Sequence, residues 1–286
     1  MEKETTYLGM NPGHVKKLKA SWLDADSNAV DNALHFNKLV KSTKATLNAS
    51  SMRTEAKESY GYEKRQSYQL AKNQKADFLK AIQRHAIVKI HLGMEKNEAN
   101  EKENRAVALK PVMELCDACK GEEGSYFKLN FFQGKRQKIS GKTVGNFPKE
   151  FMEMWTDNWM KMPDTTMPDQ FMVEYEDPET KEMRYSRVEH FTYNEEVGLG
   201  IRNQLNGLSA DDFNIYIYFG KDLNKEAANM VSFTPIIHVK IEKELDAVAN
   251  QDNQPQIMAM SVAQEPTQNG VYDIANPCPP CSAGVN

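Results

Sequence analysis

Apolar residues in the first part of the chain recur at three- and four-residue steps, the spacing of one face of an α-helix. Behind Asn11-Pro12, a typical helix opening, one such stripe covers residues 15–40. Broken helical spacing continues over residues 52–93, and a third segment covers residues 106–120. Because none of these helices could bury its stripe alone, we predict an antiparallel helical bundle over residues 1–121.

Beyond Gly121 the pattern changes from helical spacing toward alternation of apolar and polar residues, which is typical of strands. Strands separated by few helices favour an antiparallel or mixed sheet, which we predict for residues 122–247. One helix is expected at residues 148–162, and Asp177-Pro178-Glu179-Thr180 has the composition of a hairpin turn. The predicted strands are residues 125–132, 139–144, 171–175, 183–191, 214–219 and 234–242.

From about residue 248 the chain is rich in Gln, Asn, Pro and Ala and has little apolar periodicity. We therefore predict a flexible C-terminal tail over residues 248–286. The predicted fold class is α+β, with an N-terminal antiparallel helical bundle followed by a mixed or antiparallel sheet domain and this flexible tail.

Charge divides the chain into two unlike parts. Residues 1–110 carry 20 Lys and Arg against 13 Asp and Glu, whereas residues 111–286 carry 16 against 27. Such a split is compatible with a nucleic-acid or acidic partner for the first half, with two halves that attract each other, or simply with a solvated helical face. The first residues lack a secretory signal and no apolar run is long enough to span a membrane, so we expect a cytoplasmic protein that does not contact the membrane.

All four cysteines fall into two CxxC pairs, Cys116 with Cys119 and Cys278 with Cys281. Neither pair precedes a helix that would lower a thiol pKa, which disfavours thiol-disulfide exchange. Two such pairs can supply a tetrahedral four-thiolate zinc site, so zinc is the candidate cofactor. The long separation of the pairs leaves a second reading, in which a buried first pair and a reduced second pair bind no metal.

Aromatic and basic side chains interleave over residues 126–142, a mixture that can stack bases and neutralise phosphates. The alternative is that strand alternation places these aromatics in the core. The basic residues of this candidate nucleic-acid-binding segment are Lys128, Lys135, Arg136, Lys138 and Lys142.

No motif of a known catalytic centre is complete. Ser140-Gly141-Lys142-Thr143 lacks the upstream glycine of a phosphate-binding loop, because position 136 is arginine. His91 would share a helix face with Glu95 and Glu98, a group that we interpret as a solvated charge cluster. The remaining histidines form no metal motif. The chain is therefore predicted not to be an enzyme.

The C-terminal third resembles a group of uncharacterised bacterial proteins, at Ile217-Tyr-Phe-Gly220, at residues 235–241 and at the end that contains the second CxxC pair. This resemblance implies a bacterial origin, and it implies nothing about mechanism because the group has no known function. We predict a non-enzymatic interaction or structural assembly module of a bacterial cytoplasm, with a structural zinc, that contacts a protein partner through its helical half. The alternative is a nucleic-acid-binding protein that uses residues 126–142.

Overall fold

The computed structural model describes residues 9–48, 51–96, 107–117, 124–134, 136, 145–166, 168–177, 180–227, 231–242, 270–273 and 276–278. Nine of its strands are β3 (Ser67–Leu70), β4 (Ile87–His91), β7 (Val112–Cys116), β8 (Ser125–Phe131), β11 (His190–Tyr193), β12 (Phe213–Lys221), β13 (Phe233–Ile241), β14 (Gly270–Tyr272) and β15 (Asn276–Cys278). They form one antiparallel sheet in the order β14-β13-β12-β3-β8-β7-β4-β11-β15, which curls into a half-barrel.

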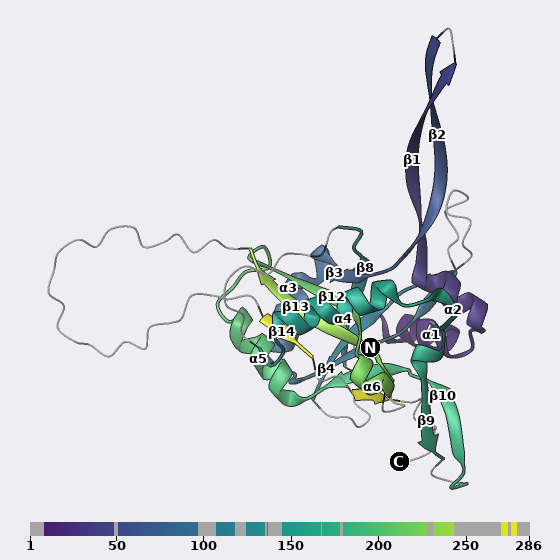
Figure 1. Cartoon of the computed structure of the whole chain (residues 1–286). Coiled ribbons are helices and arrows are strands. Elements are labelled where there is room, and N and C mark those ends of the chain that lie inside the picture. The colour runs from purple at the N-terminus through teal and green to yellow at the C-terminus, as the bar shows by residue number, and fades with distance from the viewer. Residues whose placement is uncertain are drawn as a thin grey trace, which may run out of the picture.

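The other elements surround this sheet or project from it (Figure 1). The helices are α1 (Pro12–Leu23), α2 (Ser27–Leu34), α3 (Lys75–Ile82), α4 (Lys149–Lys161), α5 (Glu195–Leu205) and α6 (Leu223–Ala227), with short 3₁₀ turns η1 (Lys72–Gln74), η2 (Asp164–Thr166) and η3 (Pro168–Phe171). Three two-stranded ribbons pair β1 (His35–Asn48) with β2 (Ser51–Lys64), β5 (Met94–Lys96) with β6 (Val107–Leu109), and β9 (Met172–Glu176) with β10 (Met183–Arg187).

The main core lies on one face of the sheet, where alternate strand residues meet aromatic side chains from the helices and loops. Trp22 of α1 and Trp159 of α4 are fully buried in it, and each ring contacts Phe171 edge-on. Both indole nitrogens donate hydrogen bonds to backbone carbonyls, which removes the cost of burying them. These contacts fix α1 and α4 against segments that are distant in the sequence.

The predicted N-terminal helical bundle is wrong. Helix α1 begins at Pro12 behind the Asn11 cap, as predicted, but it ends at Leu23, and residues 35–64 form the β1/β2 hairpin. Within residues 52–93, helix is limited to η1 and α3, and residues 106–120 contain β6 and β7. Strands from before and after residue 121 pair within the same sheet. The helices before residue 121 are therefore short elements that pack on this sheet and do not form a separate bundle.

Several elements of the second half agree with the alternation pattern. Strands β8, β9, β10, β12 and β13 and helix α4 lie where the sequence predicts them, and β9 pairs with β10 across the predicted turn. The predicted strand at 139–144 lies outside the described residues. The predicted flexible tail is corrected in part, because β14 and β15 lie within it and pair with the two edges of the sheet, at β13 and β11.

The β1/β2 hairpin projects from the body as a long arm, and the β9/β10 hairpin projects separately (Figure 1). Charged residues fix the arm at its base. Lys64 forms a 3.1 Å ion pair with Asp164, and the guanidinium of Arg65 lies 4.4 Å from the centre of the Phe131 ring. The arm therefore starts from an anchored position on the body. Within the described part of the chain, no helix is both long enough and apolar enough to cross a membrane.

Candidate metal centre

Strand register brings polar side chains together on the face of the sheet opposite the main core. Val88 and Ile90 of β4 and Phe191 of β11 point into that core. Alternation therefore turns His91 and His190 to the other face, where the two residues are direct register partners. Paired residues of antiparallel strands lie close enough for their side chains to interact, and the two imidazole centres are 5.0 Å apart.

Glu114 of β7 completes the arrangement on the same face. Its Oε2 atom lies 2.6 Å from Nε2 of His91, and the two residues are only 4% and 2% exposed. Burial alone would raise the pKa of Glu114, but the hydrogen bond from His91 and the charges of His91 and Lys89 outweigh it and lower that pKa. The ionised carboxylate can only accept a hydrogen bond, so Nε2 of His91 carries the proton and Nδ1 carries the lone pair.

Burial favours the uncharged form of both imidazole rings. Burial lowers the pKa of His91 in spite of the opposing hydrogen bond to Glu114. Burial also lowers the pKa of His190 to about 3, and the charges of His91, Lys89 and Lys19 act in the same direction. A neutral imidazole is the form that binds a metal ion.

Three potential ligand atoms converge at this point. One atom each from His91, His190 and Glu189 lies within 4.8 Å of the others. Among the described residues, Nδ1 of His91 and Nδ1 of His190 are buried and have no hydrogen-bond partner. Buried polar atoms without a partner are uncommon and costly, so their coincidence with a carboxylate needs an explanation. We refer to His91, Glu114, Glu189 and His190 as the histidine cluster.

Helix α1 packs over this face of the sheet and separates it from solvent. Its Val15 and Leu18 contact Val112 of β7 in a small apolar cluster. Lys19, on the same helix, forms an ion pair with Glu189. Nζ of Lys89 lies 3.8 Å from Oε2 of Glu114. Each of the two carboxylates of the cluster is therefore paired with one ammonium group, Glu189 with Lys19 and Glu114 with Lys89. A cation that binds here must compete with Lys19 for Glu189.

The cysteines predicted to bind zinc are only partly described. Cys116 is buried on β7 opposite Ile87, and Cys278 of β15 is the register partner of His190. Cys116 and Cys278 lie three strands apart in the sheet, and their register partners on β4 are four residues apart. Standard strand dimensions then give a separation of roughly 20 Å, so the structure does not bring the two cysteines together. Cys119 and Cys281 lie outside the described residues, and the four-cysteine site stays a prediction. The register does place Cys278 beside the histidine cluster.

The candidate nucleic-acid-binding residues are also described in part. Lys128 is exposed on β8, whereas Arg136 forms a 3.0 Å ion pair with Asp157 of α4. Of the interleaved aromatics, Phe127 is fully buried in the main core. Lys135, Lys138 and Lys142 lie outside the described residues, and nucleic-acid binding stays a prediction.

The sequence pattern alone does not reveal the histidine cluster. Helical spacing predicts that His91 lies beside Glu95 and Glu98, but His91 ends strand β4 and its neighbours come from β7 and β11. The available signal was the alternation of residues 87–91, with Val88 and Ile90 on one side and His91 on the other. Comparison of the whole chain with known protein families, curated proteins and solved structures finds no match.

Proposed function

We propose that this protein binds a divalent ion of the zinc class through His91, His190 and Glu189, and that the ion fixes the sheet of a non-enzymatic interaction module. The observation that carries the proposal is the pair of buried imidazoles, each with an Nδ1 atom that has no partner among the described residues, beside a carboxylate. An ion at this point would give the buried imidazoles and the carboxylate a shared partner and so stabilise the fold.

The donor set indicates which ion is expected. Imidazole nitrogen and carboxylate oxygen together are typical ligands of zinc, whereas calcium and magnesium prefer oxygen alone. Glu114 would act outside the ligand set, because its hydrogen bond to Nε2 of His91 fixes the ring and leaves Nδ1 available. The burial of the cluster under α1 limits the access of solvent to such an ion, which supports a structural role.

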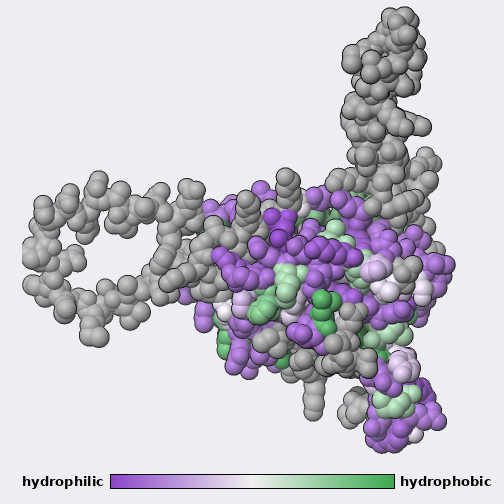
Figure 2. Space-filling model, in the orientation of Figure 1, coloured by the Kyte–Doolittle hydropathy of each residue, from purple (hydrophilic) through white to green (hydrophobic). Residues whose placement is uncertain are grey.

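The interaction-module part of the proposal is supported by the projecting hairpins. On β10 of the β9/β10 hairpin, Met183 is 58% exposed and Tyr185 is 70% exposed, and Figure 2 shows an apolar area among the polar residues of this hairpin. Large apolar side chains that gather on an exposed ribbon are typical of surfaces that contact another protein. A metal-stabilised sheet would hold such ribbons in fixed positions.

The test is the metal content of the purified protein, followed by titration with zinc and with cobalt as a spectroscopic probe. Wild-type protein should bind one ion per chain. His190→Gln should abolish binding, and Glu114→Gln should weaken it by about 10- to 100-fold, as expected for a residue that orients a ligand. His14→Gln is the matched control, because His14 is exposed on α1, and should bind like the wild type.

Lys19→Met distinguishes an ion site from a purely structural cluster. Removal of Lys19 frees Glu189 and removes a repelling charge, so metal affinity should increase. Cys278→Ser belongs in the same assay, since a loss of affinity there would extend the ligand set to the C-terminal strand. Equal metal content in the wild type and in His190→Gln, or no metal in either after zinc titration, would refute the proposal.

A further inference from the structure

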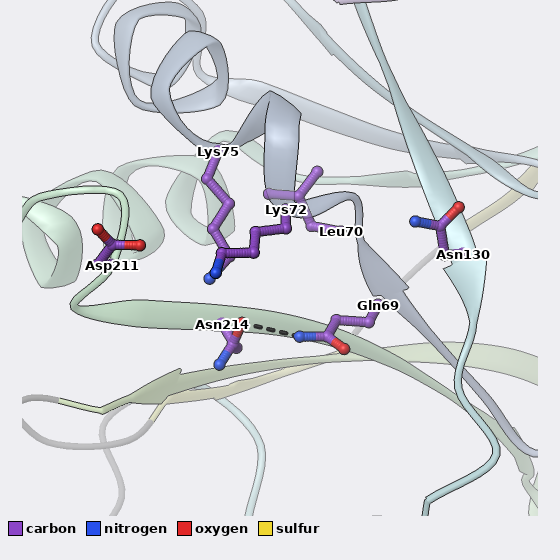
Figure 3. A pocket seen from close by; sticks show the side chains of 7 residues that line it. All are labelled: Gln69, Leu70, Lys72, Lys75, Asn130, Asp211 and Asn214. Atoms are coloured by element: carbon purple, nitrogen blue, oxygen red, sulfur yellow. Dashed lines mark hydrogen bonds between the residues drawn. The ribbon is translucent and has the colours of Figure 1, made fainter.

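A polar pocket lies where η1 and the start of α3 pass over strands β3, β8 and β12 (Figure 3). Its volume is about 400 Å³, within the usual range for small-molecule sites. Figure 3 shows the side chains of Lys72 and Lys75 extending from the helical segment toward the strands, above the amides of Gln69 and Asn214. The lining residues of this lysine pocket are Gln69, Leu70, Lys72, Lys75, Asn130, Asp211 and Asn214.

Lys75 is an unusual residue for a pocket wall, because it is only 5% exposed. Its Nζ donates a 2.6 Å hydrogen bond to the carbonyl oxygen of Phe213 and lies 5.5 Å from the centre of the Phe213 ring. An ammonium group can donate three hydrogen bonds, and the described contacts use one. Burial lowers the pKa of Lys75, Asp211 and Glu242 oppose that effect, and Lys72 adds to it. Its charge is therefore incompletely compensated.

The nearby carboxylates do not neutralise the two lysines directly. Among the described residues, neither Lys72 nor Lys75 forms an ion pair with a carboxylate. Glu242 instead accepts hydrogen bonds from Lys240 at 2.8 Å and from Asn214 at 2.7 Å. Among the described lining residues, Asp211 is thus the one carboxylate beside two ammonium groups. The described lining keeps an excess of positive charge and of hydrogen-bond donors.

We propose that the lysine pocket binds a small anion that carries a carboxylate or phosphate group, held between Lys72 and Lys75. An anionic oxygen there would accept the unused hydrogen bonds of Lys75 and supply the missing countercharge. The lining is polar apart from Leu70, which favours a small hydrophilic molecule over an apolar one. The pocket uses none of the residues of the histidine cluster, so this inference is independent of metal binding.

Calorimetric titration with inorganic phosphate and with acetate, at constant ionic strength and with chloride as the reference salt, tests the proposal. At least one of the two anions should bind saturably. Affinity should fall about tenfold in Lys72→Gln and in Lys75→Met, because each variant removes a charged hydrogen-bond donor. Lys80→Gln is the matched control, since Lys80 is an exposed lysine of α3 that pairs with Asp77, and should bind like the wild type.

The pattern of binding identifies the ligand group. Phosphate binding alone assigns a phosphate, acetate binding alone assigns a carboxylate, and binding of both assigns a general oxyanion site. If Lys75→Met does not fold, the anion affinity of Lys72→Gln still tests the proposal, because Lys72 is exposed and its replacement leaves the fold intact. Absence of saturable binding by either anion, or an equal loss of affinity in Lys80→Gln, would overturn the proposal.

Discussion

His238 shows how one side chain can make the stability of the fold depend on pH. The residue is fully buried on β13, where its ring contacts the rings of Tyr216 and Tyr218. Neither ring nitrogen has a hydrogen-bond partner among the described residues. Burial lowers the pKa of His238 from 6.5 to about 4, the charge of Lys240 acts in the same direction, and Glu242 opposes them. The folded state therefore holds this imidazole uncharged.

The unfolded chain binds a proton at His238 below about pH 6.5, whereas the folded protein binds it only near pH 4. As the pH is lowered from 6.5 to 4, the free energy of unfolding should consequently fall by about 3 kcal/mol. Below pH 4 the contribution of His238 should level off. Urea unfolding of the wild type and of His238→Phe, measured across this interval, isolates the contribution, because other groups titrate in both proteins. Parallel pH profiles would show that His238 contributes nothing.

Gly198 marks the closest approach between α5 and the segment that leads into β4. A Cβ atom at this position would lie 1.7 Å from the carbonyl oxygen of Ala86, so the backbone itself would have to move. We expect Gly198→Ala to lower the free energy of unfolding by about 2 to 3 kcal/mol, although alanine favours helix more than glycine does.

Gly200→Ala on the same helix is the control for this prediction. The added Cβ would lie 2.9 Å from a ring atom of Tyr272, a side chain that can shift. The change in unfolding free energy should therefore stay within about 1 kcal/mol. Chemical denaturation of both variants makes the comparison, and equal losses of stability would contradict the close approach of α5 to Ala86.

At the scale of single residues, the sequence could show which side chains are polar within apolar strands but not which of them meet. His91 and His190 are 99 positions apart, and Glu114 approaches His91 from a third strand. Only the register of the sheet brings them together. The cysteine pairs gave the stronger local signal because their spacing is visible in the sequence itself, although the described structure separates Cys116 from Cys278.

At the scale of elements, the wrong prediction of a helical bundle arises from apolar residues that are four positions apart. Met52, Ala56 and Tyr60 fit one face of a helix, but four is also a multiple of the two-residue period of a strand. The backbone at these positions belongs to β2. Where true alternation or dense β-branched and aromatic residues occur, as in β12 and β13, the prediction was confirmed.

The β1/β2 arm should contribute little to the stability of the body. Its strands pair only with each other within the described structure, and an isolated two-stranded ribbon is marginally stable in water. Replacement of residues 41–58 by a short turn keeps the base at Lys64 and Arg65. We expect the melting temperature to change by only a few degrees, as measured by calorimetry. Loss of the cooperative transition would mean that the arm packs on the body.

At the scale of the whole molecule, the order of strands ties the two halves of the chain together. β3 lies between β12 and β8, and β4 lies between β7 and β11. Strands from before and after residue 121 are therefore neighbours at three places in the sheet, β12-β3, β3-β8 and β4-β11, in addition to the β7-β8 pair. Composition and charge could indicate two unlike halves, but they carry no information on this pairing.

This interleaving predicts that residues 1–121 do not fold alone. In that fragment β3 loses both neighbours and β4 keeps only β7, so buried residues such as Val88 and Ile90 lose part of their cover. The cut falls between β7 and β8 and interrupts neither strand. The isolated fragment should show no cooperative thermal transition, and its amide resonances should be poorly dispersed in an NMR spectrum. Co-expression with residues 122–286 should restore a single thermal transition. A well-dispersed spectrum for residues 1–121 would instead require that the N-terminal strands form a sheet without their partners, which the pairing of β3 with β12 and β8 opposes.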